Sequence, residues 1–356
     1  MENKIGLLTF HRTTNFGSLL QTYALYKKIQ DLGYPCEIID YRCPAIEKRE
    51  NLNKPYVERN IRNTIKNFLF LPGYKKKAKY LQDFVVQNFQ ISDVYTPENI
   101  EMAGNRYSKV FVGSDIVWGR DITDNDYAYF LNFVDERKKK YAFSSSVGDY
   151  AIRGDENRVA FYLNDFQGIA VREKAAVEWV SSINGPEAKW VCDPTMLLTT
   201  TEWNNYIAPN NYNGKYVLVY FRDPHSKNLN DAKIYAEKNN CKVIYINYDM
   251  PVSGVKNIKP KSLNEFLGLI FHAQMVFTAS YHGMLFSLYY NKEFLFYTRA
   301  HKSRVLSLAN RIGVQGNCGD EIDVMKYKKI DYAIVNENIE SFREESISIL
   351  TKMLNE

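Results

Sequence analysis

The segment TASYHGMLFS, residues 278–287, combines residue types that can carry acid–base chemistry beside an anion. The apolar run MVFTAS predicts a strand, residues 280–283 a turn, and the apolar residues from Met284 a helix. Gly283 allows a tight turn and the close approach of a ligand, and the helix start offers N–H groups and a partial positive charge to a carboxylate or phosphate. His282 can exchange a proton near neutral pH. The alternative is a histidine that makes only structural hydrogen bonds.

Cationic side chains follow several other predicted strands. Arg222 follows YVLVYF and Arg172 follows GIAV, and the strand EFLFYT is followed by Arg299, His301, Lys302 and Arg304. Guanidinium groups bind carboxylates and phosphates through paired hydrogen bonds, so arginines at strand ends suit a small substrate with two anionic groups. Each of these residues has the alternative of an ordinary solvated surface charge.

Two loops in the first half of the chain have the polar residues that an anion or a hydroxyl-bearing ligand needs. Asn15 and Gly17 stand at the start of a predicted helix, and Gly113, Ser114 and Asp115 follow the strand KVFV. Asp115 is a candidate hydroxyl-binding carboxylate or proton acceptor. Neither loop matches the glycine patterns of dinucleotide sites or P-loops, and the histidines lack metal-ligand spacing. We therefore expect no metal and no cofactor.

The elements that must position these side chains are parallel strands joined by helices. KIGLLTF, the helical segment LLQTYALYKKIQDLG and CEIIDY form one βαβ unit, and near-continuous apolar strands of this kind indicate a Rossmann-like α/β fold. The alternation continues through KVFVGSD, KKYAFSSSVG, GIAVRE and AKWVCDPT, then begins again with YVLVYFRD, CKVIYINY, MVFTAS and EFLFYT. We predict two parallel-sheet domains, residues 1–198 and 199–356, with a ligand-binding cleft between them.

Residues 44–100 interrupt this rhythm and predict a helical insertion in the first domain. The stretch 54–79 is basic, with Arg59, Arg62, Lys66, Lys75, Lys76, Lys77 and Lys79. It is either a packed insertion with a solvated basic face or a patch that contacts an anionic membrane surface. Near the C-terminus, residues 338–354 have apolar side chains on one face, which predicts a terminal helix of the second domain.

Composition narrows the possible functions. The chain has 356 residues, 45% of them hydrophobic and 24% charged, as in ordinary globular proteins. A net charge of +5 does not require a nucleic-acid partner, and none is expected. The five scattered cysteines form no C-x-x-C pair, which fits a reducing cytoplasm. Without a signal-peptide pattern or a run of about 18 apolar residues, we expect a cytoplasmic protein, at most peripheral at the inner face of the membrane.

Five segments, spread in order over most of the chain, resemble the polysaccharide pyruvyl transferase family. They are GLLTFHRTTNFGSLLQTYAL, FVGSDIVW, AVREK, VCDPTMLL and TASYHGMLFSLYYNKEF. The resemblance implies two domains of the GT-B type and phosphoenolpyruvate as the donor substrate. It also implies that a cyclic pyruvate ketal forms on a hexose of a cell-surface polysaccharide, such as a capsule or exopolysaccharide, or of its lipid-linked precursor.

The resemblance further implies roles for matching residues. His282 would be the general acid or base, with Asp115 as a second catalytic candidate. Phosphoenolpyruvate would be bound mainly from the second domain, by Arg172, Ser280, Tyr281, Gly283, Arg222, Arg299 and Lys302. The saccharide acceptor would be bound from the first domain, by Asn15, Gly17, Gly113 and Ser114. Some members of the family have an arginine two residues before the histidine, where this chain has Ser280, so Arg222, Arg299 or Lys302 would have to supply the second anion clamp.

Two other functions stay open on the sequence. A nucleotide-sugar glycosyltransferase of the same fold would hold a diphosphate at the helix that follows His282. A non-catalytic component of a polysaccharide assembly complex would bind glycan without releasing phosphate. The fold alone does not choose among them.

Overall fold

The computed structural model describes residues 3–50, 61–148, 154–221, 223, 225–299 and 302–356, with the backbone alone for residues 61–71. The chain divides into two compact units. The first comprises Met1–Glu50, Asp83–Leu198 and Ile339–Glu356, and the second Asn51–Gln82 and Thr199–Asn338.

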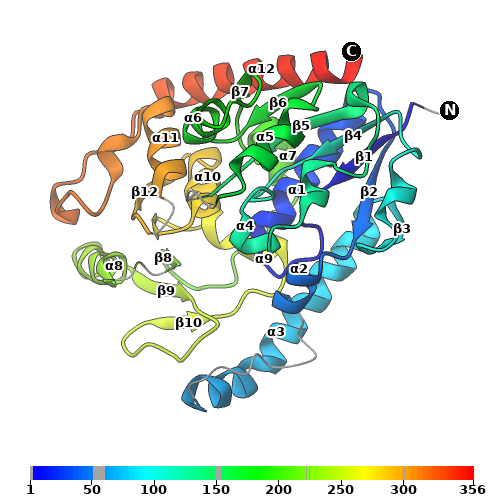
Figure 1. Ribbon diagram of the computed structural model, residues 1–356. Coiled ribbons are helices and arrows are strands. Elements are labelled where there is room, and N and C mark those ends of the chain that lie inside the picture. Colours follow the sequence, from blue (N-terminus) through cyan, green and yellow to red (C-terminus); the bar gives the residue numbers. More distant parts are fainter. Residues whose placement is uncertain (1–2, 51–60, 149–153, 222, 224, 300–301) are drawn as a thin grey trace. The chain divides into compact units, whose positions relative to one another are not determined.

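The first unit contains a seven-stranded parallel sheet with the strand order β3-β2-β1-β4-β5-β6-β7. Its strands are β1 (Ile5–Leu8), β2 (Cys36–Tyr41), β3 (Ile91–Tyr95), β4 (Lys109–Val112), β5 (Lys140–Ser145), β6 (Gly168–Val171) and β7 (Ala188–Trp190). Every residue of β1, β2 and β5 is buried, as expected for parallel strands covered on both faces. Figure 1 shows β1, β2, β3 and β4 side by side.

The helices that connect these strands are α1 (Phe16–Asp31), α2 (Pro44–Arg49), α4 (Arg120–Thr123), α5 (Glu156–Asn164) and α6 (Lys174–Ser182). The helix α3 (Ile61–Asn88) begins among the residues of the second unit and ends among those of the first. Short 3₁₀ turns cover Ile100–Ala103, Tyr127–Phe130, Arg137–Lys139 and Pro194–Leu197.

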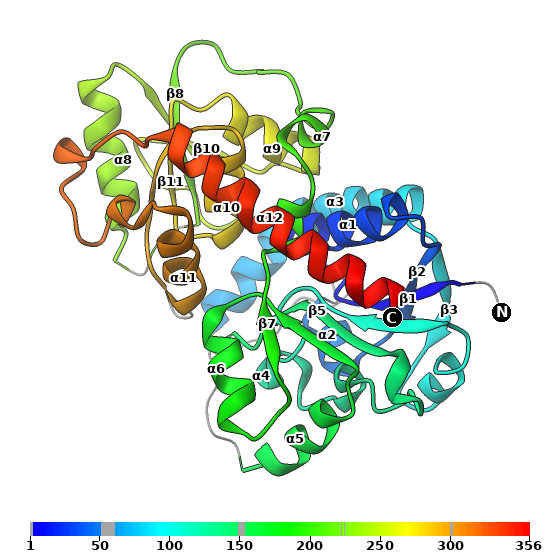
Figure 2. The same cartoon turned by 90° about the horizontal axis from the view of Figure 1, so that it is seen from above.

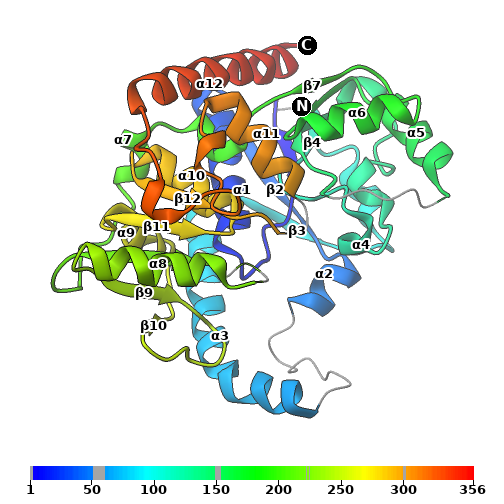
Figure 3. The ribbon, with the colours of Figure 1, turned by 90° about the vertical axis from the view of Figure 1, so that its left-hand side faces the viewer.

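The second unit contains a five-stranded parallel sheet with the order β10-β9-β8-β11-β12. Its strands are β8 (Tyr216–Tyr220), β9 (Lys242–Ile246), β10 (Lys256–Ile258), β11 (Met275–Thr278) and β12 (Glu293–Phe296). Its helices are α7 (Thr200–Asn204), α8 (Lys227–Lys238), α9 (Leu263–Phe271), α10 (Tyr281–Tyr289) and α11 (Lys302–Ile312), with 3₁₀ turns at Gln315–Asn317 and Val324–Lys326. Figure 3 shows α8 lying along β9. Two parallel α/β sheets therefore confirm the predicted fold class.

The last helix, α12 (Tyr332–Asn355), corrects the predicted domain assignment. From Ile339 onward it belongs to the first unit, not to the second. Phe342 packs against Trp190, the Ser346 hydroxyl accepts a hydrogen bond from the Cys192 backbone N–H, and Lys109 donates to the Met353 carbonyl. Figure 2 shows the C-terminal end of this helix on the side of the first sheet, near β1. Sequence order alone placed it with the strands that precede it.

The segment predicted as a helical insertion of the first domain, residues 44–100, is only partly helical, and its part from Ile61 to Gln82 groups with the second unit instead. It contains α2 and α3, but residues 91–95 form the edge strand β3, which pairs with β2. The alternation ISDVY is short and polar, as edge strands often are, so a helix was the easier interpretation. Residues 51–60 of the insertion lie outside the described residues. Among the helices that the structure describes, none has a stretch long and apolar enough to cross a bilayer.

Candidate active site

His282 lies in the first turn of α10, directly after the strand β11. The prediction that this helix begins at Met284 is wrong, because Ser280 is its N-cap and Tyr281 its first residue. The Ser280 hydroxyl accepts a hydrogen bond from the Gly283 N–H at 3.3 Å, the usual bond of a serine N-cap. His282 is therefore held by a capped helix end rather than by a flexible turn. Its side chain is half-buried.

Gly283 is required by packing rather than by backbone conformation. A Cβ at this position would lie 2.4 Å from the Thr278 Oγ1 and 3.0 Å from the Cδ1 of Tyr220. Thr278 cannot easily move, since its hydroxyl donates to the Tyr220 carbonyl at 2.8 Å and accepts from the Ser280 N–H at 3.0 Å. The start of α10 thus packs directly on the carboxyl ends of β8 and β11.

Ser280 also contacts Tyr220. Burial raises the pKa of the Tyr220 phenol, and a side-chain hydrogen bond with Ser280 partly opposes that rise. The residue that replaces an arginine of some family members therefore serves as a helix cap here. Ser280 provides no cation, so the anion clamp must come from elsewhere.

A cation from α11 contacts this segment. The Arg304 guanidinium carbon lies 5.7 Å from the centroid of the Tyr281 ring, within the range of a cation–π contact. The Tyr281 ring is in turn nearly perpendicular to the His282 imidazole, with centroids 5.5 Å apart. The sequence places Arg304 among the cations that follow the strand EFLFYT, but Arg304 was not among the residues predicted to bind the donor. The helical spacing of Val305, Leu308, Ala309 and Ile312 was the signal that could have placed Arg304 on a helix.

The other predicted cations of this unit are less enclosed. Arg299 is exposed, with its guanidinium carbon 5.5 Å from the Phe221 ring centroid, and Lys302 is exposed as the first residue of α11. Arg222 lies outside the described residues. The sequence RAHKSR was compatible with a solvated loop, whereas the structure starts a helix at Lys302.

In the first unit, Asn15 and Asp115 line one pocket of about 100 Å³. Thr13, Ser18 and Glu50 add further polar groups to its wall. Asn15 is the N-cap of α1, and its side-chain oxygen accepts from the Gly17 N–H at 2.9 Å. Gly17 is a buried residue of this helix, so it offers no exposed surface for the predicted contact with a ligand in this conformation.

The loop Gly113–Asp115 has an unusual backbone. Gly113 has φ 131°, and a Cβ there would lie 2.1 Å from the Phe143 carbonyl oxygen, so only glycine fits. Asp115 has φ 78°, a left-handed conformation that costs a non-glycine residue roughly 1–3 kcal/mol and occurs preferentially at functional sites. Its carboxylate accepts from the Ile116 N–H at 2.8 Å. Ser114 is fully buried behind it.

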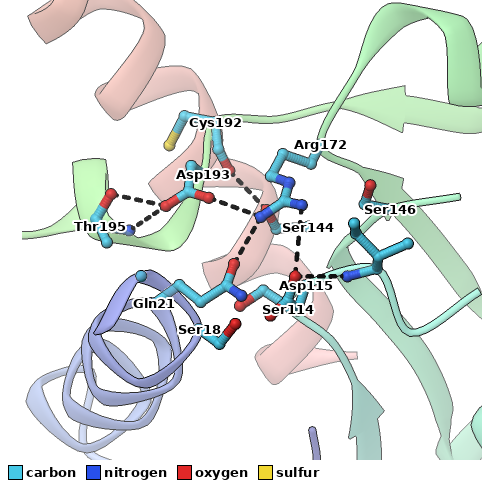
Figure 4. A network of polar contacts seen from close by, with 12 residues as sticks. Ser18, Gln21, Ser114, Asp115, Ser144, Ser146, Arg172, Cys192, Asp193 and Thr195 are labelled. Carbon is cyan, nitrogen blue, oxygen red and sulfur yellow. Dashed lines mark hydrogen bonds and ion pairs between the residues drawn. The ribbon is translucent and has the colours of Figure 1, made fainter. Parts of the chain in front are cut away.

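Arg172 is the centre of a buried polar network beside Asp115 (Figure 4). Its Nη1 donates to the Gln21 Oε1 at 2.7 Å and to the Asp193 Oδ2 at 2.9 Å. Its Nη2 lies 3.8 Å from the Asp115 Oδ1, and its Nε 3.9 Å from the Glu173 Oε2. The one guanidinium of Arg172 thus already lies among several carboxylates, and these disfavour the binding of a further anion, such as phosphoenolpyruvate, beside it. The geometry favours a positioning role, and the predicted contact with phosphoenolpyruvate stays a prediction.

The structure therefore groups the predicted residues in two places. Ser280, Tyr281, His282 and Gly283 form one segment in the second unit, and Asn15, Asp115 and Arg172 lie around one region of the first. In the part of the chain that is described, no group of three or more histidine, cysteine, aspartate or glutamate side chains could hold a metal ion.

Comparison with protein families decides the assignment. The model of the family described as polysaccharide pyruvyl transferase matches residues 15–301. The chain belongs to this family. It is therefore a transferase, and the match contains the two groups of site residues described above.

Solved structures similar to this family member are remote in sequence. Arabidopsis thaliana UGT89C1 in complex with UDP has a TM-score of 0.49 at 10% identity, covering 100% of both chains. The glycosyltransferase SnogD from Streptomyces nogalater has a TM-score of 0.46 at 9% identity, covering 97% of this chain and 95% of its own. UDP-N-acetylglucosamine 2-epimerase from Rickettsia bellii has a TM-score of 0.45 at 9% identity, covering 100% and 97%. Scores this low carry no conclusion about substrate. No curated protein matches the chain significantly.

Proposed function

We propose that the protein transfers the pyruvyl group of phosphoenolpyruvate to a hexose of a cell-surface polysaccharide or its lipid-linked precursor, forming a cyclic ketal. One observation carries this proposal: the pyruvyl transferase family model matches residues 15–301, and this stretch includes His282 at the start of α10. The side chain of His282 is half-buried at a helix N-terminus, where a general acid can stand next to a bound anion.

The reaction requires a proton at C3 of the enol phosphate. Protonation there gives C2 oxocarbenium character, and an acceptor hydroxyl attacks C2. The C2–O bond to phosphate then breaks, and a second hydroxyl of the same sugar closes the ketal. The two acceptor hydroxyls each lose a proton. One of these protons restores the acid that protonated C3, and the other leaves with the phosphate. His282 is the residue we assign to this proton transfer.

The donor needs cations for its carboxylate and phosphate. The N-terminus of α10 supplies a partial positive charge. In the same unit, β12 is followed by three cationic residues, Arg299, Lys302 and Arg304. Of these, Arg304 contacts Tyr281, the neighbour of His282, so we assign it as the main clamp and the exposed Arg299 and Lys302 as supplementary charges. This assignment replaces the family's arginine at the position of Ser280.

The acceptor side is assigned to the first unit. The pocket with Asn15, Ser18 and Asp115 offers an amide, a hydroxyl and a carboxylate, which together can bind and deprotonate sugar hydroxyls. Asp115 is held in place by the Ile116 N–H and lies near Arg172. No cofactor is needed in this scheme, because phosphoenolpyruvate brings its own leaving group.

A membrane-bound acceptor would bring the protein to the cytoplasmic face of the membrane. In the described part of the basic stretch 54–79, Lys75, Lys76 and Lys79 are exposed and can meet anionic headgroups. Lys77 does not share this surface, because it is buried with its Nζ 4.4 Å from the centroid of the Tyr248 ring. The proposed contact is thus electrostatic and peripheral.

The direct test incubates the protein with phosphoenolpyruvate and a panel of galactosides, glucosides and mannosides. We expect phosphate release and a product heavier than the acceptor by one pyruvic acid minus one water. His282→Ala should lower turnover by about 10²–10⁴-fold, whereas His225→Ala, at an exposed histidine of the same unit, should leave it unchanged. Transfer from a nucleotide sugar with no response to phosphoenolpyruvate would instead establish a glycosyltransferase. Glycan binding without phosphate release would establish the non-catalytic role.

A further inference from the structure

A second pocket, of about 300 Å³, lies in the second unit and shares no residue with the His282 segment. It is formed by α9, by residues 208–212 before β8 together with Tyr216 at the start of β8, and by Ile258 at the end of β10 with residues 259–261 after it. The β10 side of the pocket lies three strands from β11, about 14 Å at the usual strand spacing, whereas Tyr216 on its other side belongs to β8, the direct neighbour of β11. The volume is at the lower end of that of small-molecule sites.

The walls of this pocket are firmly held. The Ala208 N–H donates to the Asn264 carbonyl at 3.1 Å, and the Ala208 carbonyl lies 3.1 Å from the Nε2 of His272. Gly268 allows this approach, since a Cβ there would lie 2.6 Å from the Ala208 carbonyl oxygen. The Tyr216 hydroxyl donates to the Leu269 carbonyl at 2.8 Å. The cavity is therefore a built feature of α9 and its neighbouring segments and not a loose gap.

The lining combines apolar and polar surfaces in the way a sugar ring requires. Pro209, Ile258 and Tyr212 offer surfaces for C–H groups, while His272 and Glu265 offer hydrogen-bonding atoms for hydroxyls. The Tyr212 ring is fixed on one side by Lys256, whose Nζ lies 4.4 Å from the ring centroid. Glu265 is fixed by the Lys261 backbone N–H, which donates to its carboxylate at 2.7 Å.

The charges at the pocket favour an acidic ligand. The half-buried side chains of Lys259 and Lys261 line it against the single carboxylate of Glu265. Burial lowers the pKa of Lys259 and the charge of Asp249 opposes this effect. Because two lysines line the pocket, a carboxylate on the ligand can accept charge-assisted hydrogen bonds from them.

We propose that this pocket binds a carboxylate-bearing hexose of the polymer at a distance from the residue that undergoes transfer. The inference rests on the proposed function, because a pyruvate ketal turns a neutral hexose into such an acidic residue. A polymer already modified at one hexose would be held here while the next hexose reacts. The site then favours repeated modification of one chain over release after each transfer.

The test uses two probes: a methyl galactopyranoside carrying a cyclic pyruvate ketal, and the same galactoside without it. Calorimetric titration should show the ketal binding at least about tenfold more tightly than the neutral sugar, since one charge-assisted hydrogen bond contributes a factor of this size. The variant Lys259→Gln/Lys261→Gln should lose this preference. Lys233→Gln, at an exposed lysine on α8, should keep it. Unfolding curves show whether each variant is folded. If the double variant does not fold, Lys259→Gln or Lys261→Gln alone is tested in the same titration.

His282→Ala separates this site from the catalytic centre. We expect it to abolish transfer but to retain ketal binding that depends on Lys259 and Lys261. The proposal would be overturned if the wild-type protein bound both probes equally. It would also be overturned if Lys259→Gln/Lys261→Gln still bound the ketal and His282→Ala did not. A wild-type protein that binds the ketal through the lysines but transfers nothing would refute the proposed function and leave the pocket's specificity for acidic sugars standing.

Discussion

The Arg172 guanidinium donates a hydrogen bond to the Asp193 carboxylate across 2.9 Å, with both side chains completely enclosed. Arg172 follows β6 and Asp193 follows β7, so the pair joins the ends of two adjacent strands. Asp193 also accepts from the Thr195 hydroxyl at 2.7 Å, and Arg172 also donates to Gln21 on α1. The pair therefore connects several elements to the loop that holds Asp115.

Replacing Arg172 by methionine should destabilise the protein strongly. The substitution leaves the buried carboxylate of Asp193 without its cationic partner, although the hydrogen bond from Thr195 remains, and costs about 3–5 kcal/mol for pairs of this kind. The unfolding free energy from urea titration measures it. Lys138→Met is the control, because Lys138 forms an exposed pair with Glu136 and its loss should leave the unfolding free energy nearly unchanged. A stable Arg172→Met protein with a raised KM for phosphoenolpyruvate would instead favour the ligand-binding role that the sequence suggests.

Substitutions at Asn15 separate its capping role from acceptor binding. Asn15→Ala should destabilise the protein by about 0.5–2 kcal/mol, because the Gly17 N–H loses its side-chain acceptor. Asn15→Asp keeps the cap but replaces the amide donor by a second acceptor oxygen. If the amide binds an acceptor hydroxyl, Asn15→Asp should raise the acceptor KM at unchanged stability. An unchanged KM would limit Asn15 to its capping role.

The sequence predicted the parallel strands and most of the connecting helices because buried strands are almost continuously apolar. CEIIDY, for example, forms β2 with the predicted ends. Patterns of this kind do not show which sheet a distant element joins, so α12 was assigned to the wrong unit and β3 was missed. Both depend on contacts between residues far apart in the chain, such as Trp190 with Phe342.

The candidate site was predictable to a similar extent. Motif order identified His282, Asp115 and Arg172, but not how the side chains are used. Whether an arginine faces a ligand or a buried aspartate is decided by tertiary packing, and Arg172 faces Asp193. Arg304 was recognised only as one of the cations after EFLFYT, because its contact with Tyr281 depends on the packing of α11. The pocket beside Lys259 and Lys261 has no local sequence signal at all, since it joins three separate segments.

Stability should fall in acid partly through Asp40. Burial raises the pKa of this carboxyl, but hydrogen bonds from His11 and Arg42 outweigh it, and the pKa falls from 3.8 to about 2. A carboxyl with a lowered folded-state pKa stabilises the fold above pH 3.8, and this contribution disappears as the pH drops toward 2. Asp40→Asn should therefore flatten the pH dependence of the unfolding midpoint in this window. An equally steep dependence in the variant would assign the acid sensitivity to other groups.

Gly283→Ala tests whether catalysis depends on the close packing of α10 against β11. Alanine is favoured over glycine in a helix by about 1 kcal/mol. Its Cβ, however, would lie 2.4 Å from the Thr278 Oγ1, and overpacking of this kind costs roughly 1–3 kcal/mol. The helix start should shift, and His282 with it. A misplacement of about 1 Å can lower turnover by about 10²-fold. Expressed as a free energy, the loss in kcat should therefore exceed the loss in unfolding free energy.

Gly316→Ala is the control for this substitution, because a Cβ at Gly316 would meet no atom within 4 Å. Removing the obstacle should restore part of the activity. In Gly283→Ala/Thr278→Ala the Oγ1 is absent, so kcat should recover relative to Gly283→Ala although the Thr278 hydrogen bonds are lost. If Gly283→Ala retains wild-type kcat and stability, the position of His282 does not depend on this contact, and α10 is free to adjust against the strand.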